Sequence, residues 1–301
     1  MKLKSTFKNL ATLLVLIITS SVFAQDAFQG QATYMSKTTM DMDNFGGREL
    51  SPERKKMIME RMKTMLEKTF ILDFNKSEST YKEDEALDAP GGGGRGFMMG
   101  GMAAGTIYKD VKENVLLHDQ EFFGKQFLIK DSLVKLDWKM SGESKQIGKY
   151  TAFKATATKK VDAADWTNMR RRGNDRDKKK DDNKEVAEVE KDSTKTDAPK
   201  DPFDDIEIPE EIEVTAWYTM DIPVNSGPGE YWGLPGLILE VNAGRTTILC
   251  SKIVMNPSDK NEIKKPTKGK EVTMEEYQDI VKKKMEEMRE MFRSRGGRGR
   301  N

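Results

Sequence analysis

The side chains that most often carry out covalent catalysis are scarce in this sequence. Its 301 residues include one histidine, His118, and one cysteine, Cys250. A Ser–His catalytic pair could therefore use only His118, and a Cys–His pair only Cys250 with His118. Ser226 lies in Asn-Ser-Gly rather than in the Gly-x-Ser-x-Gly sequence that presents a nucleophilic serine. The glycines at 91–96 do not follow a clear strand into a helix, as a phosphate-binding loop requires. We therefore expect a protein that is not an enzyme.

Methionine is present in unusual number, with 19 residues in the chain. Thioether sulfur is a soft ligand that favours Cu(I). Met98, Met99 and Met102 lie in a glycine-rich stretch where three sulfurs could converge without disturbing a core, and Met59 could join them. The first three residues form the candidate metal site. The alternative is packing, because methionine is also a common filler of adaptable apolar surfaces.

A second set of candidates lies between residues 212 and 254, where aromatic, aliphatic, glycine and proline residues are all dense. If the protein binds an apolar ligand, we expect the groove here. Its expected lining residues are Trp217, Tyr218, Tyr231, Trp232, Leu234 and Pro235. The alternative is that these large side chains anchor the core, which is the usual role of aromatic rings.

The elements that position this stretch follow from its pattern. Alternation with period two predicts a strand over 214–222, and Pro223 ends its ladder because proline has no N–H to donate. Strands are also predicted over 237–241 and 246–254, joined by a hairpin loop. Pro235 and Gly236 are expected to shape a bend, since proline presets one dihedral and glycine admits positive φ.

The same stretch carries a family resemblance. Residues 233–238 read Gly-Leu-Pro-Gly-Leu-Ile, the sequence after which the GLPGLI family is named, and their flanks at 217–223 and 239–241 are similar to that family as well. The resemblance extends over roughly residues 28–256, with breaks. It implies a secreted protein of a Bacteroidota-type Gram-negative envelope, and no agreed function.

Two capping sequences predict helices. Ser51, followed by proline and glutamate, is a helix start, and this helix should run to about residue 67. Thr273-Met274-Glu275-Glu276 is a capping box that opens a second helix with an apolar stripe as far as residue 292. Further strands are predicted over 28–37, 69–81, 106–111, 115–121, 125–130, 133–140 and 150–159.

These elements predict a mainly β (α+β) fold: a curved antiparallel meander sheet with one helix in the N-terminal half and one at the C-terminus. The arrangement resembles periplasmic lipoprotein-carrier folds, in which a sheet half-wraps a helix and can shelter an acyl chain. By this analogy we expect a non-catalytic protein that binds a hydrophobic ligand, a lipid or an envelope protein partner. The alternative is a periplasmic copper-binding protein that uses the methionines above. We expect no cofactor.

The chain is expected to be exported to the periplasm or beyond. Three lysines, an apolar run over 10–18 and Ala24 have the order of a secretory signal peptide over 1–24, and no later apolar stretch is long enough for a membrane span. Loss of those lysines would change the net charge from +1 to about −2, so bulk attraction of the chain to nucleic acid or anionic lipid is not expected, and nucleic acid is not an expected partner.

A single β-rich domain is expected over 25–292. It should contain a mobile Gly/Met loop at 89–105 and a disordered insertion at 168–206, whose dense mixed charge cannot bury enough surface to fold. Residues 293–301 form a Gly/Arg-rich tail.

Overall fold

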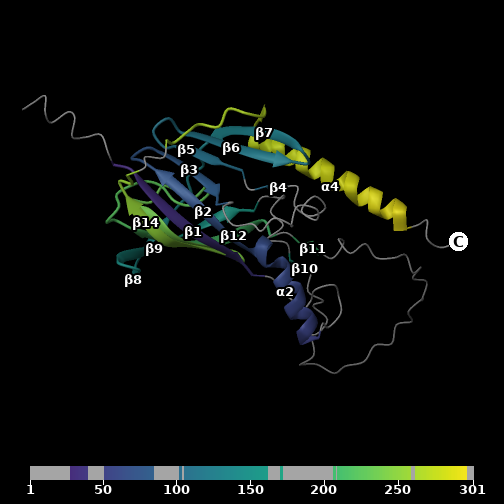
Figure 1. Cartoon of the computed structure of the whole chain (residues 1–301), viewed down its shortest axis with the longest axis horizontal. Helices are drawn as coiled ribbons and strands as arrows, with labels where there is room; N and C mark the ends of the chain where they lie inside the picture. Colours follow the sequence, from purple (N-terminus) through teal and green to yellow (C-terminus); the bar gives the residue numbers. More distant parts are fainter. Residues whose placement is uncertain are drawn as a thin grey trace, which may run out of the picture.

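The computed structural model describes residues 28–39, 51–84, 102–103, 105–161, 170–171, 206–207, 209–258 and 262–296 (Figure 1). The expected signal peptide, Met98, Met99, most of the charged insertion and the end of the tail lie outside these residues.

Most of the described residues form strands. Thirteen of these strands make one sheet, in the order β15-β7-β6-β5-β3-β2-β1-β14-β13-β12-β9-β8, with β4 paired to β6 beside this path. Two further short strands, β10 and β11, pair with each other. The strands are β1 Gly30–Thr38, β2 Glu67–Phe74, β3 Glu78–Glu83, β4 Met102–Ala103, β5 Ile107–Asp110, β6 Val115–Phe122, β7 Lys125–Ser132, β8 Lys139–Ile147, β9 Tyr150–Lys160, β10 Arg170–Arg171, β11 Ile206–Glu207, β12 Glu211–Thr219, β13 Leu237–Ala243, β14 Thr246–Met255 and β15 Lys270–Val272.

The predicted mainly β fold with two helices is confirmed, with one difference in strand direction. Neighbouring strands are antiparallel except β15, which runs parallel to β7 and makes the sheet mixed. The first strand, β1, lies inside the sheet, between β2 and β14. Its partner β14 comes from the far end of the chain, with Gly30 opposite Met255 (Figure 1).

Both predicted helices begin at their capping residues. Helix α2 (Pro52–Leu66) follows Ser51, whose side chain accepts a hydrogen bond from the Arg54 amide. Helix α4 (Met274–Gly296) follows a reciprocal capping box: the Glu276 amide donates to Thr273 Oγ1, and the Thr273 amide donates to Glu276 Oε2. No helix in the described part of the chain is long and apolar enough to cross a membrane.

The single strand predicted over 69–81 was wrong, because this segment forms two strands joined by a turn. The Asn75 side-chain oxygen accepts hydrogen bonds from the amides of Ser77 and Glu78, at 2.8 and 2.7 Å. An asparagine that bonds the backbone two and three residues later makes a turn. The apolar alternation of Phe70, Leu72 and Phe74 stops at this turn, so the polar residues from Asn75 to Ser79 mark the break.

The strand predicted over 133–140 was also wrong. Residues 133–138 are irregular, and β8 begins at Lys139 and runs through Gly142, where a break was expected. A register shift between Met140 and Ser144 accommodates the glycine as a bulge. Short β4 and β15 were not predicted, and β4 occupies two residues of the expected Gly/Met loop.

The core lies where the sheet meets the segment between β12 and β13. Side chains of β1 and β2, such as Tyr34 and Leu72, pack with Ile222 and Val224 of that segment. A second cluster packs Tyr218 and Leu234 against β13. The start of α4 closes a third cluster at the other end of the sheet.

Candidate functional site

The segment between β12 and β13 folds back on itself before it rejoins the sheet. Strand β12 ends at Thr219, before the end predicted at Ile222, and the Leu237 amide then donates to the Ile222 carbonyl. One turn further, the Ile238 amide donates to the Ser226 carbonyl, and the Tyr231 amide donates to the Pro228 carbonyl. Residues 222–238 thus form a compact loop whose own backbone satisfies part of its hydrogen bonding.

A buried lysine from β5 holds this loop. Lys109 is 1% exposed, and its Nζ donates to the carbonyl oxygens of Gly227, Gly229 and Tyr231 at 2.7, 2.8 and 3.2 Å. An ammonium group has three protons, so each acceptor is matched by one donor. We call Lys109 and these three carbonyls the lysine clamp.

Burial is the main electrostatic influence on the clamp. It lowers the pKa of Lys109 to about 7, against the opposing attraction of Glu230. Burial also lowers the pKa of His118, with Glu230 and Asp119 again opposing. The Glu230 carboxylate itself pairs with the Lys159 ammonium. The clamp therefore places a lysine with a near-neutral pKa under the loop that precedes the Gly-Leu-Pro-Gly-Leu-Ile sequence.

Sequence reasoning missed Lys109. In its short strand the lysine shares a face with Ile107, while Tyr108 occupies the other face, so the alternation suggests an ordinary exposed lysine. A weak signal was available in the loop, where glycine and proline at 227–229 leave backbone carbonyls free of bulky side chains.

Residues 233–236, which we call the GLPG corner, form the predicted bend. Gly233 has φ of 92°, and Leu234 is fully buried. A Cβ on Gly236 would lie 1.9 Å from the Thr219 carbonyl oxygen, so only glycine lets the chain pass β12 this closely. Pro235 is exposed. The corner is confirmed as a sheet bend that one buried leucine anchors, but its positive φ falls at Gly233 rather than at Gly236.

The six residues predicted to line a ligand groove fall into separate environments. Tyr218, Tyr231 and Leu234 are buried together in one cluster of the core. Trp217 packs against another cluster, under the Lys145 ammonium at 4.2 Å from its ring centre. Trp232 is half-buried and Pro235 is exposed. The structure brings three of the six together inside the core, and the groove stays a prediction.

Two tryptophans are fixed at the surface next to the corner. Trp138 Nε1 donates to the Trp232 carbonyl at 2.8 Å, and Trp232 Nε1 donates to the Val134 carbonyl at 2.9 Å. Both rings are half-buried, and the Val134 side chain is 74% exposed. We call Val134, Trp138, Trp232 and Pro235 the corner surface. Half of it comes from residues 133–138, which were wrongly predicted to be a strand.

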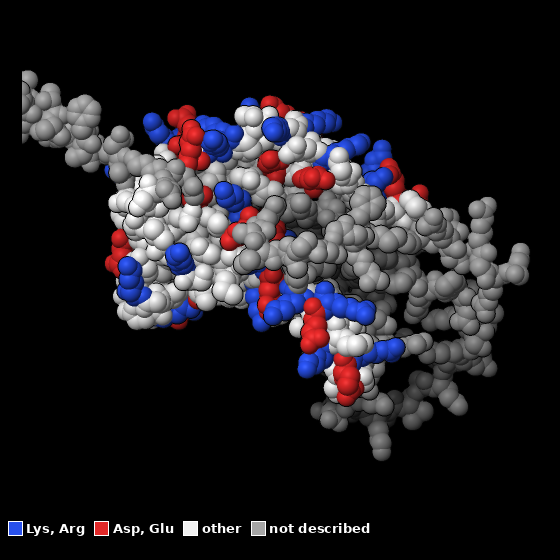
Figure 2. Space-filling view, viewed as in Figure 1, with Lys and Arg blue, Asp and Glu red and all other residues white. Residues whose placement is uncertain are grey.

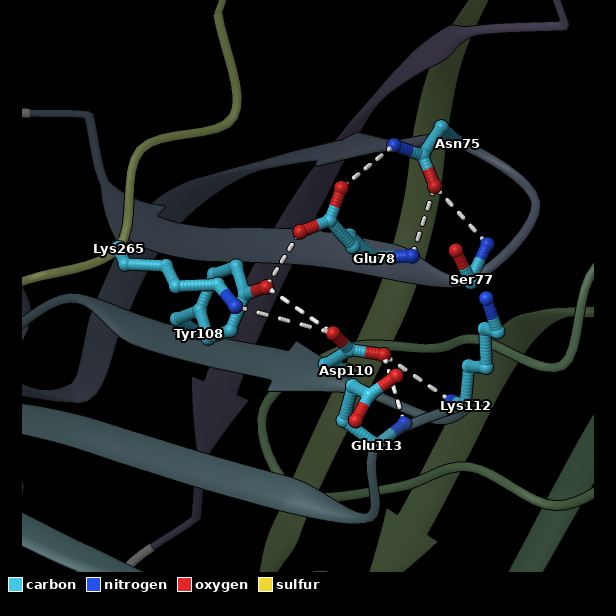
Figure 3. Close-up of polar contacts among 8 residues, drawn as sticks. All are labelled: Asn75, Ser77, Glu78, Tyr108, Asp110, Lys112, Glu113 and Lys265. Atoms are coloured by element: carbon cyan, nitrogen blue, oxygen red, sulfur yellow. Dashed lines mark hydrogen bonds and ion pairs between the residues drawn. The ribbon is translucent and has the colours of Figure 1, made fainter.

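On the face of β5 opposite to Lys109, a polar cluster stabilises the turns at residues 75–78 and 110–113 (Figure 3). The Tyr108 hydroxyl donates to Glu78 Oε1, while Asp110 Oδ1 accepts from the amides of Lys112 and Glu113. Burial, followed by the Glu78 carboxylate, raises the pKa of Tyr108, which keeps the hydroxyl protonated. Because these oxygens serve hydrogen bonds within the chain, we assign the cluster a structural role.

The candidate metal ligands lie mostly outside the described residues. Only the backbone of Met102 is described, in β4, and Met59 lies 40% exposed on α2. Within the described ranges, no group of three His, Cys, Asp or Glu side chains could hold a metal ion. The methionine site stays a prediction.

Residues 138–240 match the family described as "Protein of unknown function (Porph_ging)", the GLPGLI-type family. This part of the chain is similar to the GLPGLI-type family. The matched region begins at Trp138 and contains both the GLPG corner and the three carbonyls of the lysine clamp, whereas Lys109 precedes it. The GLPGLI sequence itself therefore supplies the bend and the buried leucine described above.

Two solved structures of PNGF-II, in space groups C2 and P21, are similar to this chain at 12% identity, with TM-scores of 0.44 and 0.42. Each match covers 85% of this chain and 33% of the other, so the chain spans about a third of the length of those proteins. A comparison with curated proteins found no match.

Proposed function

We propose that the protein is a non-catalytic exported envelope protein that binds an apolar group at the corner surface. The group would belong to an envelope protein partner, a lipid or another hydrophobic ligand. The observation that carries the proposal is the pair of half-buried tryptophans fixed by hydrogen bonds to backbone carbonyls. Tryptophan is enriched among the residues that dominate binding energy at interfaces.

Rigidity supports this reading. Trp232 lies between Tyr231, whose carbonyl is held by Lys109, and Gly233, which begins the corner. A side chain that is ordered before binding loses less conformational entropy when the partner arrives. The corner surface is therefore organised as a preformed contact.

A protein partner is favoured over an acyl chain because of what fills the interior. Ile222, Val224 and Leu237 of the loop are buried against side chains of β1 and β2. An acyl chain that entered between the sheet and the loop would have to displace these residues, whereas a partner at the corner surface displaces none of them.

The proposal is tested by placing a charge on the exposed edge of the corner surface. Val134→Glu should abolish binding, because a carboxylate buried in an apolar contact is costly and the hydrogen bond from Trp232 goes to the Val134 backbone. Met35→Glu is the matched control, since Met35 is 59% exposed on β1, in a different part of the sheet. Native mass spectra of mature protein, taken gently from its own envelope, are the measurement.

The expected result is a discrete mass excess that is kept by Met35→Glu and lost by Val134→Glu. An excess kept by both variants, or absent from the unaltered protein, would contradict the proposal. An excess of one copper ion, abolished when Met98, Met99 and Met102 are changed to leucine, would support the metal-binding alternative instead.

A further inference from the structure

Helix α4 is anchored to the sheet through its first turns. Tyr277 makes edge-to-face contacts with Phe122 and Phe127, with ring centres 6.1 and 5.6 Å apart, and Val281 is 2% exposed. The Met274 amide also donates to Asp131 Oδ2. These contacts fix the direction of the helix.

The apolar stripe of α4 continues beyond this anchor. Met285, Met288 and Met291 follow Tyr277 and Val281 at helical spacing, on the same side of the helix. Met285 is 44% exposed and Met291 is 54% exposed. Figure 1 shows α4 running past β7 and away from the sheet. The second half of the helix thus presents an apolar stripe that the described residues only partly cover.

The charge around this stripe is positive. Residues 282–296, the second half of the helix, contain six lysines and arginines against three glutamates, an excess of three positive charges in a chain whose total is +1. Lys282 and Lys283 are exposed at the start of this region. Figure 2 shows lysine and arginine side chains, with some acidic ones, along the part of the molecule where α4 lies.

We propose that the second half of α4, residues 282–296, docks on an anionic lipid surface. Met285, Met288 and Met291 would enter the boundary between headgroups and acyl chains, while Lys282 and Lys283 contact the headgroups. A helix with one apolar face, a strongly polar opposite face and an excess of positive charge has the chemistry of an interfacial helix. The corner surface plays no part in this contact, so the inference is independent of the proposed function.

Sedimentation of the full mature protein with vesicles provides the first test. Vesicles of phosphatidylcholine with phosphatidylglycerol should bind it about tenfold more tightly than phosphatidylcholine alone, because each basic residue near an anionic surface contributes. Binding should fall in about 1 M salt, where the screening length is about 3 Å. Equal binding to both vesicles, or no binding to either, would overturn the proposal.

The stripe itself is tested by the combined change of Met285, Met288 and Met291 to glutamine, which has similar helix propensity. Vesicle binding should fall about tenfold or more with helix content unchanged, because three apolar side chains no longer enter the lipid. Met35→Gln is the control and should bind like the unaltered protein. A triple variant that still binds normally would exclude the stripe.

Methionine oxidation by peroxide offers a second readout that needs no substitution. Anionic vesicles should slow oxidation of Met285, Met288 and Met291 several-fold and leave the exposed Met35 and Met140 unchanged. Unaltered rates at the stripe would contradict docking. Retention on vesicles that contain envelope proteins, but not on protein-free anionic vesicles, would overturn the lipid assignment and point to a protein partner.

Discussion

A buried lysine needs hydrogen-bond acceptors in the protein, because its ammonium group loses the hydrogen bonds of water on burial. For Lys109 these acceptors are three backbone carbonyls that a glycine-rich loop brings to one point. In return, the ammonium supplies one hydrogen-bond donor to each of these three carbonyls. The clamp therefore links the loop conformation to the protonation of one side chain.

Replacement of Lys109 by methionine should destabilise the protein by about 2–4 kcal/mol, since buried carbonyl groups lose their donor. Urea unfolding of the variant measures this loss. Lys112→Met is the control, because Lys112 is exposed in the turn between β5 and β6 and should change stability by less than about 0.5 kcal/mol. A Lys109→Met variant as stable as this control would show that the clamp contributes little.

Stability should rise with pH between about 7 and 9. Folding lowers the pKa of Lys109 from 10.5 to about 7, so above pH 7 the unfolded chain binds more protons at this group than the folded one, and stability increases with pH. The slope is at most about 1.4 kcal/mol per pH unit. The neutral amine still donates two hydrogen bonds and no longer carries a desolvated charge.

This pH window is set by the other shifted groups. Burial lowers the pKa of His118 from 6.5, so its contribution to stability also increases with pH, mainly at lower pH than that of Lys109. Burial raises the pKa of Cys250 from 9.0 to about 12, so its contribution is present below pH 9 and is lost above it. Urea unfolding of the unaltered protein and of Lys109→Met between pH 7 and 9 is the measurement. A flat profile in the unaltered protein would show that the clamp keeps its proton throughout.

At the scale of elements, the GLPG corner depends on a close backbone approach. Gly236→Ala should destabilise by about 2 kcal/mol or more, because the new methyl group would overlap the Thr219 carbonyl and neither backbone can move without disturbing β12. Thermal unfolding monitors the change. Gly142→Ala is the matched control, since a Cβ at that β8 position would meet no atom within 4 Å. Equal effects of the two substitutions would contradict the close approach.

Elements with a clear period or a capping sequence were predictable from the sequence. The alternation of β12 to β14 and the caps at Ser51 and Thr273 identify their elements, because local chemistry decides them. Strands β4 and β15 have two and three residues, which are too few to show a period. They are strands because they pair with β6 and β7. The contact between Trp138 and Trp232 could not be predicted either, because irregular residues, which have no repeating pattern, bring the two together.

At the scale of the molecule, the charged insertion leaves and re-enters the sheet at adjacent points. Lys160 pairs with Glu211, and the Val161 amide donates to the Glu210 carbonyl at 2.9 Å. Strands β9 and β12 are therefore hydrogen-bonded neighbours regardless of what connects them. The order of the other strands was not predictable, because alternation shows which face is buried and does not identify the neighbouring strand.

Replacement of residues 162–209 by a two-residue Asn-Gly turn should leave the sheet intact and raise stability by about 3 kcal/mol, since a roughly 24-fold shorter loop loses less entropy on closure. Urea unfolding and far-ultraviolet circular dichroism provide the measurement. The change would remove the β10–β11 pair, which should not matter to the sheet. A loss of more than about 2 kcal/mol would show that the insertion packs on the domain.

The central position of β1 has a consequence for how the protein is made. A ribosome releases β1 more than 200 residues before β14, and β2 can cover only one of its two edges in the meantime. An open strand edge is a template for pairing with other chains. Until its last third has been synthesised, each newly made molecule can join its neighbours through the strand that later lies in the middle of its own sheet. Crowding of nascent chains, rather than the stability of the finished fold, should limit the yield.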